Sequence, residues 1–275
     1  MPTEYFERRE RALLGDRFDA LYAAPQETAA RGVTVSALRA APEQFAAQAD
    51  FPVEPSPFCK AGFVVQDPAF KPGRHPYHHA GVFYSQEPSA SSAAPLLGVR
   101  PGMRVLDLCA GSGCIGLAIA KNAPGCHAVL GELDEGALRV CRQNIRRNDL
   151  TGRVVSLQMN ALEKPPAHLG EFDAIVSNPP YIPDGDIAGL DVSVRDYEPH
   201  LALKGGEDGL DFYRAICAQW RTALRADGRL LFEVGIGQAD DVLRIMRSCG
   251  FGDVEITPDL NGIPRVVSGI LCTEV

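Results

Sequence analysis

The segment Asn178-Pro179-Pro180-Tyr181 has residue types that could hold an amino group for chemistry. Proline disfavours helical backbone in the residue before it, so Asn178 and Pro179 are expected to be extended after the apolar run 172–176. The prolines lack an N–H, so their carbonyls can project from the strand end beside the Asn178 amide oxygen. Two such acceptors would hold both hydrogens of an NH₂ group, and Tyr181 would pack on a planar amide or base. The tetrad therefore indicates nitrogen methylation; a proline-rich turn that closes a strand is the alternative.

A second group of residues could bind a nucleotide-like ligand. A glycine pattern of the form G-x-G-x-x-G follows the apolar stretch 104–108 and consists of Gly111, Gly113 and Gly116. Glu132 comes at the end of the next apolar stretch. Such a unit places an anionic group at a helix amino terminus and an acid on a ribose diol. Alone, the pattern is weak, and it fits an NAD-dependent dehydrogenase equally well.

Two further strand ends distinguish these alternatives. Asn160 follows the predicted strand 153–158 and could pair with an adenine edge, while the Asn-Pro-Pro-Tyr tetrad ends the strand 172–177. The ends of parallel strands meet at one edge of a sheet, so loop, ribose acid and base contact would lie together there. The fourth strand end would then supply a substrate site, which does not suit a dehydrogenase.

The elements that must position these residues alternate between strands and helices. Strands are predicted near 104–108, 127–131, 153–158, 172–177, 229–234, 252–258 and 265–271, and helices near 114–122, 135–148, 208–224 and 238–249. Asp134 and Asp208 are the expected N-caps. This order predicts an α/β fold with a seven-stranded doubly wound sheet. The loop 183–207 is interpreted either as a substrate lip or as an unstructured surface loop.

Residues 99–275 resemble the class I S-adenosylmethionine-dependent methyltransferases, and within them the HemK-type enzymes that methylate the Gly-Gly-Gln glutamine of peptide chain release factors. The runs that carry the closer resemblance are 178–183, 194–199, 202–203, 205–210, 213–214, 231–233, 237–238, 259–262 and 265–267.

The resemblance implies an antiparallel last strand, S-adenosyl-L-methionine as cofactor and a release factor as protein substrate. The residues that it places around the cofactor are Asp107, Cys109, Ala110, Gly111, Ser112, Gly113, Glu132, Asn160, Ala161 and Asn178. Those that it assigns to the glutamine are Asn178, Pro179, Pro180 and Tyr181. Glu132 and Asn160 stand where the family often has Asp, so we expect altered affinity but retained binding.

Residues 1–98 resemble a different family, the Sun-type RNA 5-methylcytosine methyltransferases, in their N-terminal part. The segments concerned are 6–9, 14–15, 51–55, 75–81 and 84–90. We therefore expect a small α+β accessory domain over 1–98 and a catalytic domain over 99–275, with a joint near 101–108. Natural recombination and deliberate fusion would look alike in such a mosaic. Residues 33–36 depart from the Arg-Val-Asn segment of that family, which weakens an RNA-binding interpretation.

Three classes of function stay open: methylation of a protein glutamine, methylation of an exocyclic amine in a nucleic acid, and cofactor binding without a native substrate. Methylation of a cytosine is disfavoured. Cytosine methylation at carbon 5 needs a cysteine nucleophile, but no Pro-Cys pair occurs and Pro179-Pro180 stands where that family carries it. Methylation of an exocyclic amine in a nucleic acid uses similar tetrads, although residues 194–214 favour a protein glutamine as acceptor. The third class is an engineered chimera that binds cofactor without a native substrate.

Composition indicates an intracellular enzyme. The chain has 275 residues, 45% of them hydrophobic, without an apolar run near the ~20 residues that a bilayer requires. Its eight cysteines lack C-x-x-C spacing, so we expect reduced thiols, no zinc and a cytoplasmic location.

Histidines and net charge weigh against metal and RNA. His75, His78 and His79 are expected to be structural or exposed, with no partnering acid nearby, so no metal is predicted. The net charge is −8, and residues 1–98 hold 9 Lys and Arg against 11 Asp and Glu. No basic footprint is visible, so RNA is only weakly supported as a partner.

Overall fold

The computed structural model divides the chain into two compact units, Met1–Pro88 and Ser89–Val275. The described residues are 31–35, 40–57, 59–67, 70–71, 75–80, 82–85, 96–190, 195, 199–259 and 262–272. Several segments that carry the family resemblances fall outside them, namely 6–15, 86–90, 194, 196–198 and 260–261.

In its described residues, the first unit has a four-stranded antiparallel sheet and two short helices. Its elements are β1 (Arg31–Val35), α3 (Pro42–Gln48), β2 (Val53–Pro55), β3 (Gly62–Val65), α4 (Pro76–His79) and β4 (Phe83–Ser85), and the strand order is β2-β3-β1-β4. Phenylalanines and valines form its core, with the ring centroids of Phe45 and Phe63 5.4 Å apart and those of Phe45 and Phe83 5.7 Å apart. The predicted small α+β domain is confirmed.

His75 has the acidic partner that the sequence analysis did not expect. Its Nε2 lies 3.1 Å from Asp50 Oδ1, and its Nδ1 accepts a hydrogen bond from the Tyr77 N–H at the start of α4. The expectation of no nearby acid was wrong because the two residues are far apart in the sequence and meet only in the folded unit. Within the described part of the chain, no cluster of three or more metal-ligating side chains occurs.

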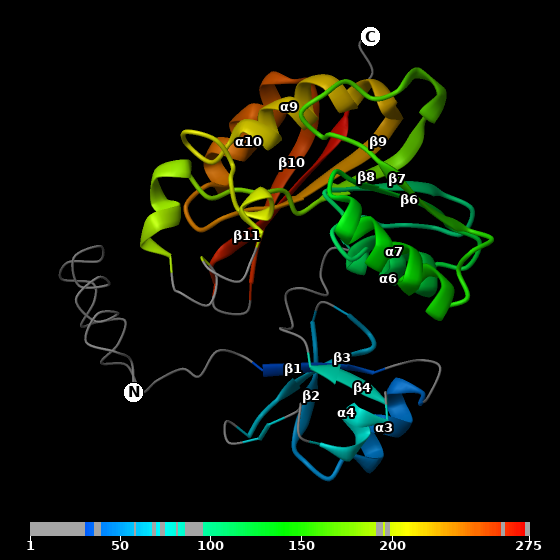
Figure 1. The fold of residues 1–275 in the computed structure, drawn as a ribbon. Helices are drawn as coiled ribbons and strands as arrows, with labels where there is room; N and C mark the ends of the chain where they lie inside the picture. The colour runs from blue at the N-terminus through cyan, green and yellow to red at the C-terminus, as the bar shows by residue number, and fades with distance from the viewer. Residues whose placement is uncertain are drawn as a thin grey trace, which may run out of the picture. The chain divides into compact units, whose positions relative to one another are not determined.

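The second unit is built on a seven-stranded sheet (Figure 1). Its strands are β5 (Arg104–Leu108), β6 (His127–Glu132), β7 (Val154–Gln158), β8 (Phe172–Ser177), β9 (Leu224–Glu233), β10 (Phe251–Pro258) and β11 (Pro264–Leu271). They lie in the order β10-β11-β9-β8-β5-β6-β7. The strands β5 to β9 pair in parallel, whereas β11 is antiparallel to both neighbours. The predicted fold, including the antiparallel last strand, is confirmed.

Helices cover both faces of this sheet. Figure 1 shows α6 (Cys114–Asn122) and α7 (Glu135–Arg147) on one face, and α9 (Asp211–Gln219) and α10 (Ala239–Ser248) on the other. The larger core lies under α9 and α10 and contains the buried Trp220, Tyr213 and Phe232. In the described residues no helix is long and apolar enough to cross a membrane.

Most of the predicted element positions agree with the structure. Asp134 caps α7 as expected, since its carboxylate accepts from the Ala137 N–H at 2.7 Å. Asp208 does not cap α9. That helix begins at Asp211, and the Asp208 carboxylate accepts from Leu210 and pairs with Arg214. The predicted helix 208–224 also ends sooner, because the chain tightens into a 3₁₀ turn at Trp220–Ala223 and β9 begins at Leu224.

The loop after β8 is partly ordered by short helical turns. Described 3₁₀ turns cover Asp184–Gly189 and His200–Ala202, whereas 191–194 and 196–198 lie outside the described residues. The Ile182 N–H donates to Leu203 O at 3.0 Å, and the Gly205 N–H donates to Ile182 O at 2.8 Å. These two bonds bring the end of the loop back beside the residues that follow the tetrad.

Candidate functional site

The candidate site lies where the chain reverses its direction across the sheet. β5 is followed in space by β6 and β7 on one side and by β8 on the other. Ligands of doubly wound sheets bind at the carboxyl ends of the strands beside such a switch point. In register, Leu108 pairs with Ser177 and with Gly131, and Glu132 pairs with Gln158. The loop after β5, Glu132, Asn160 and the tetrad therefore emerge at one edge.

Two glycines of the pattern that follows β5 lie against side chains of β6 and α7. Gly111 and Gly113 have φ angles of 54° and 86°. A Cβ at Gly113 would lie 2.8 Å from Cys141 Sγ, and one at Gly116 would lie 2.2 Å from Leu130 Cδ2. Two of the three glycines thus allow α6 to pack on the sheet. Gly111 is different, because a Cβ there would have no neighbour within 4 Å and the backbone faces open space.

Asp107 holds the start of α6. Its side chain is 1% exposed, and its Oδ2 accepts from the Gly116 N–H at 2.8 Å, whereas Oδ1 has no hydrogen-bond partner. Burial raises the pKa of this carboxyl to about 7; the Gly116 hydrogen bond lowers it and the nearby Glu132 charge raises it further. Asp107 does not line the cavity described below, so its place is beneath the loop.

Glu132 connects the glycine loop to the turn after β6. Its Oε2 accepts from the Gly111 N–H at 2.8 Å, and its Oε1 accepts from the N–H groups of Leu133 and Asp134 at 2.7 and 2.9 Å. A carboxylate offers about four acceptor positions, so one remains for a ligand. The side chain that the sequence analysis assigned to a ribose therefore also orders the loop.

Asn160 is similarly engaged by its surroundings. Its Nδ2 donates to Glu163 Oε1 at 3.0 Å, and its Oδ1 accepts from the Leu162 N–H at 3.1 Å. The side chain closes a turn after β7. The neighbouring Ala161 is buried, and its carbonyl accepts from the Trp220 indole at 3.0 Å.

The tetrad follows β8 directly. Ser177, the last residue of the strand, is buried, and its hydroxyl donates to Leu108 O at 2.8 Å. Tyr181 is half-buried and packs against the core under α9 and α10. The Tyr181 carbonyl accepts from Gln238 Nε2 at 2.9 Å. Gln238 was not predicted as a site residue, because this contact joins residues that are far apart in the sequence.

A cavity of about 160 Å³ brings the predicted residues together. Of those named in the sequence analysis, it is lined by Cys109, Gly111, Glu132, Asn160, Ala161, Asn178 and Pro180. It is not lined by Asp107, Ala110, Ser112, Gly113, Pro179 or Tyr181. The lining residues that were not predicted as site residues are Leu133, Asp134, Ala137, Met159, Pro199, Leu201, Ala202 and Phe212. Leu133 and Asp134 follow Glu132, and Met159 precedes Asn160, so their places beside predicted site residues could have indicated them.

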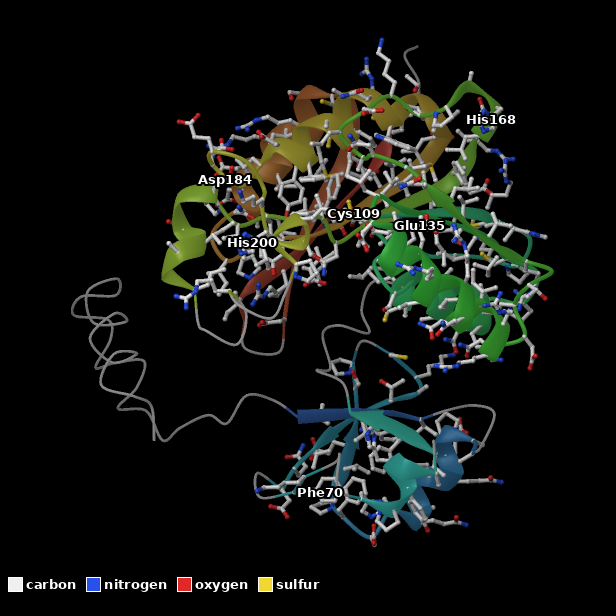
Figure 2. The ribbon with its side chains drawn as sticks, viewed as in Figure 1. Phe70, Cys109, Glu135, His168, Asp184 and His200 are labelled. Atoms are coloured by element: carbon white, nitrogen blue, oxygen red, sulfur yellow. The ribbon has the colours of Figure 1, made fainter. Side chains whose placement is uncertain are left out.

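Cys109 occupies an unusual backbone position at this cavity. Figure 2 labels it near the middle of the second unit, and its φ of 57° lies in the left-handed region that favours glycine. Burial, followed by the Glu132 charge, raises the pKa of its thiol to about 12. The thiol is therefore neutral at physiological pH, and it does not act there as a thiolate nucleophile.

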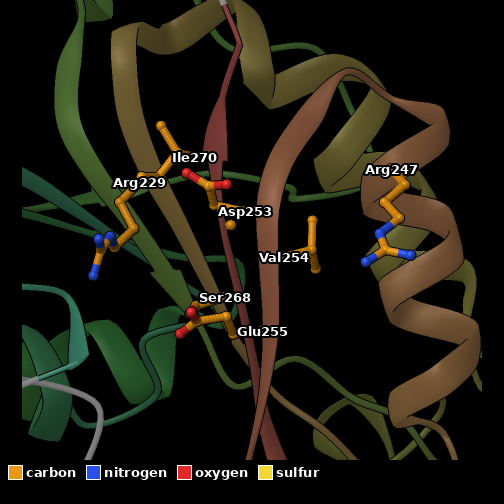
Figure 3. Close-up of a pocket in the computed structure, with 8 residues that line it drawn as sticks. Arg229, Arg247, Asp253, Val254, Glu255, Ser268 and Ile270 are labelled. Atoms are coloured by element: carbon orange, nitrogen blue, oxygen red, sulfur yellow. The ribbon is translucent and has the colours of Figure 1, made fainter.

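A second hollow lies elsewhere on the same sheet. It has a volume of about 400 Å³ and lies around β9, β10 and β11, with Arg247 contributed by α10 (Figure 3). Arg229 and Arg247 line it together with Asp253 and Glu255. The Arg229 guanidinium donates to Leu96 O at 2.6 Å. Its strands are not those that carry the loop, the acid and the tetrad, so the candidate site is the first cavity.

Two family models match overlapping parts of the chain. Residues 1–88 match the family described as the N-terminal domain of 16S rRNA methyltransferase RsmF, and residues 75–192 match the methyltransferase small domain. Parts of the chain thus match two different methyltransferase family models. The mosaic character of the chain, inferred from the sequence, is thereby confirmed.

Two curated relatives of the chain are release factor glutamine methyltransferases. The chain is 46% identical over 167 residues to a release factor glutamine methyltransferase of Geobacter sulfurreducens, which covers 60% of this chain and 57% of that protein. It is 40% identical over 167 residues to one of Clostridium acetobutylicum, covering 61% and 59%. The chain thus spans less than two thirds of the length of these relatives.

Solved structures support the fold. A methyltransferase homolog protein from Pyrococcus horikoshii superposes with a TM-score of 0.61 at 17% identity, covering 98% of this chain and 94% of that one. At this identity the likeness establishes the fold alone. The second unit has the class I methyltransferase fold.

Proposed function

We propose that this chain is an S-adenosylmethionine-dependent N-methyltransferase that modifies the side-chain amide of a glutamine in a peptide chain release factor. One observation carries the proposal: Asn178 and Pro180 of the tetrad line the same cavity as Glu132 and Asn160. An amino-group clamp and a nucleotide-type site thus share one cavity. The names of the relatives support the glutamine as substrate.

The residues at the cavity fit the proposed cofactor. The remaining acceptor position of Glu132 suits a ribose diol, and the open space at Gly111 lets a ligand approach the backbone. Met159, Ala161 and Phe212 supply apolar surface for a base. When bound, S-adenosylmethionine would supply an activated methyl group on a sulfonium. Asp107 and the residues of the loop Cys109–Gly113 that lie outside the cavity wall would support the site from below.

The clamp would align the amide nitrogen. Asn178 Oδ1 and the Pro179 carbonyl would each accept one N–H of the substrate amide, which draws electron density onto nitrogen and points it at the cavity. Tyr181 would contact the amide plane. Alignment of the amide nitrogen with the methyl group would supply most of the rate enhancement. After transfer the methylated nitrogen would carry one proton too many, and this acidic proton would then leave.

The two parts of the chain would divide the work. We assign catalysis to a domain over 99–275 and an accessory role to a domain over 1–98, in a cytoplasmic enzyme. The net charge of −2 in the first part gives no support for RNA as the substrate.

Transfer of labelled methyl from S-adenosylmethionine tests the proposal. We expect label in a release factor that contains Gly-Gly-Gln, and none in the same protein with that glutamine replaced. Parallel reactions with RNA and DNA test the other classes of acceptor. Label in either nucleic acid, without label in the release factor, would contradict the assignment.

Variants of Asn178 test the clamp. Asn178→Ala should keep most of the cofactor affinity and lower the transfer rate by about 10²-fold or more, as when a positioning group is removed. Asn178→Asp should also be slow, because its charge would stabilise the sulfonium before transfer. Asn122→Ala is the matched control, since Asn122 is an exposed amide whose Nδ2 donates within α6 to Ala118 O at 2.8 Å. Parental rates in both Asn178 variants would reduce the tetrad to a turn.

A further inference from the structure

Gln238 uses both ends of its side-chain amide to join separate loops. It lies just before α10 and is half-buried. Its Nε2 donates to Tyr181 O at 2.9 Å and approaches Gly209 O at 3.4 Å. Its Oε1 accepts from the Gly235 N–H at 3.1 Å. One side chain thus links the tetrad, the segment before α9 and the loop after β9.

Three glycines allow the segments that meet at Gln238 to approach one another closely. A Cβ at Gly209 would lie 2.3 Å from Tyr181 O and 2.6 Å from Gln238 Nε2. A Cβ at Gly235 would lie 2.6 Å from Gln238 Oε1, and one at Gly205 would lie 2.8 Å from Tyr181 Cα. Any side chain at these three positions would displace backbone or the Gln238 amide. Gly209 and Gly235 therefore leave room for the Gln238 amide, and Gly205 leaves room for the Tyr181 backbone.

The tetrad needs such a support because of its prolines. Pro179 and Pro180 have no N–H, so this part of the backbone cannot be held through their nitrogens. The Tyr181 carbonyl offers an acceptor instead, and a primary amide is suited to it because it donates at one end and accepts at the other. The Ile182 N–H, bonded to Leu203 O at 3.0 Å, holds the next residue.

We propose that Gln238 is a positioning residue that sets the orientation of the Asn178–Tyr181 backbone. The inference rests on the proposed function, since the clamp must aim a substrate nitrogen. Neither Gln238 nor Tyr181 lines the cavity, so the effect of Gln238 falls on transfer and not on cofactor binding. A displacement of the clamp by about 1 Å is enough to cost a large factor in rate.

Gln238→Met tests the role in steady-state kinetics, because methionine has a similar length and no amide. We expect kcat for methyl transfer to a release factor to fall by about 10- to 100-fold, with unchanged Kd for S-adenosylmethionine. Gln219→Met is the matched control. Gln219 is also half-buried and its Nε2 donates to a backbone carbonyl, that of Leu162, at 2.9 Å. Equal losses of kcat in the two variants would overturn the proposal.

Gln238→Glu separates positioning from general loss of stability. A carboxylate keeps the acceptor for the Gly235 N–H but cannot donate to Tyr181 O, whereas a protonated carboxyl can. The rate of the variant relative to the parent should therefore rise as the pH falls from about 8 to about 6. A ratio that is constant with pH, in a variant as slow as Gln238→Met, would count against the donated bond.

Hydrogen exchange tests the inference independently of any activity. The Ile182 N–H should exchange faster in Gln238→Met than in the parent, while Gln219→Met leaves it unchanged. Should the parent methylate no release factor, the proposed function fails, and exchange still decides the positioning role. Unchanged exchange at Ile182 in Gln238→Met would refute that role even if the enzyme is active.

Discussion

Replacement of Asp107 by Asn should change how the stability of the second unit depends on pH. Asp107 is 1% exposed, and burial raises its pKa from 3.8 to about 7 in the folded protein. Between these values the folded state binds a proton that the unfolded state has released. The free energy of unfolding contributed by this group therefore falls as the pH rises towards 7, and the loss persists above it.

The magnitude follows from the size of that rise. Each pKa unit corresponds to about 1.4 kcal/mol, so the rise from 3.8 to about 7 gives about 4 kcal/mol as an upper value. The asparagine of the variant would not titrate, and its oxygen can still accept from the Gly116 N–H. The amide nitrogen of the asparagine would take the place of Asp107 Oδ1, which has no hydrogen-bond partner. Its buried N–H groups would therefore be unpaired, which lowers the free energy of unfolding by about 1–3 kcal/mol at every pH. The free energy of unfolding of the variant, relative to that of the parent, should thus be about 3 kcal/mol higher at pH 8 than at pH 5.

Urea unfolding at pH 5 and pH 8 measures the difference. Trp220, the only tryptophan of the chain, is fully buried in the second unit and reports its unfolding by fluorescence. Asp186→Asn is the control, because Asp186 is exposed in the loop after the tetrad. If Asp107→Asn changes the free energy of unfolding equally at both pH values, the argument from burial of the charge is refuted.

Three further outcomes are expected. Glu132→Ala should weaken S-adenosylmethionine binding in calorimetry by about 1–3 kcal/mol, because a ribose hydroxyl of the bound ligand would lose its acceptor; unchanged affinity, or tighter binding of NAD, would exclude the assignment. Gly116→Ala should lower the free energy of unfolding in urea by about 1–3 kcal/mol, because its Cβ would lie 2.2 Å from Leu130 Cδ2; a stable variant would show that α6 can move away. The full chain, with a net charge of −8, should retain little RNA in filter binding; strong, steeply salt-dependent affinity would contradict this.

Sequence predicted the elements whose signals are local. The helix Cys114–Asn122 has the predicted bounds, because a glycine pattern ends the strand before it and apolar spacing continues after it. The Asp134 cap was likewise predictable from the residues that follow it. Asp208 carried the same cap signal and failed, since Arg214 and the Leu210 N–H compete for its carboxylate. The capping propensity of Asp208 was thus outweighed by its ion pair with Arg214.

Contacts between distant segments could not be predicted in this way. Pro199, Leu201 and Ala202 line the cavity from the long loop after the tetrad, although nothing in their spacing relates them to β6 or β7. Gln238 meets Tyr181 across 57 residues of sequence, and Asp50 meets His75 across 25. The order of the strands was enough to predict where the site lies. The residues of the loop after the tetrad that line the cavity could not be predicted, because that loop folds back over the carboxyl ends of the strands only in the folded protein.

The use of Glu132 explains why a longer acid fits this site. Its carboxylate extends from the end of β6 to the Gly111 N–H after the neighbouring β5, and also accepts two N–H groups of its own turn. An aspartate has one methylene fewer and would need the loop to approach more closely to keep all three bonds. The charge that orders the loop also disfavours ionisation of Asp107 beneath it. The two carboxylates together hold the glycine loop and the start of α6, because Glu132 accepts from the Gly111 N–H and Asp107 accepts from the Gly116 N–H.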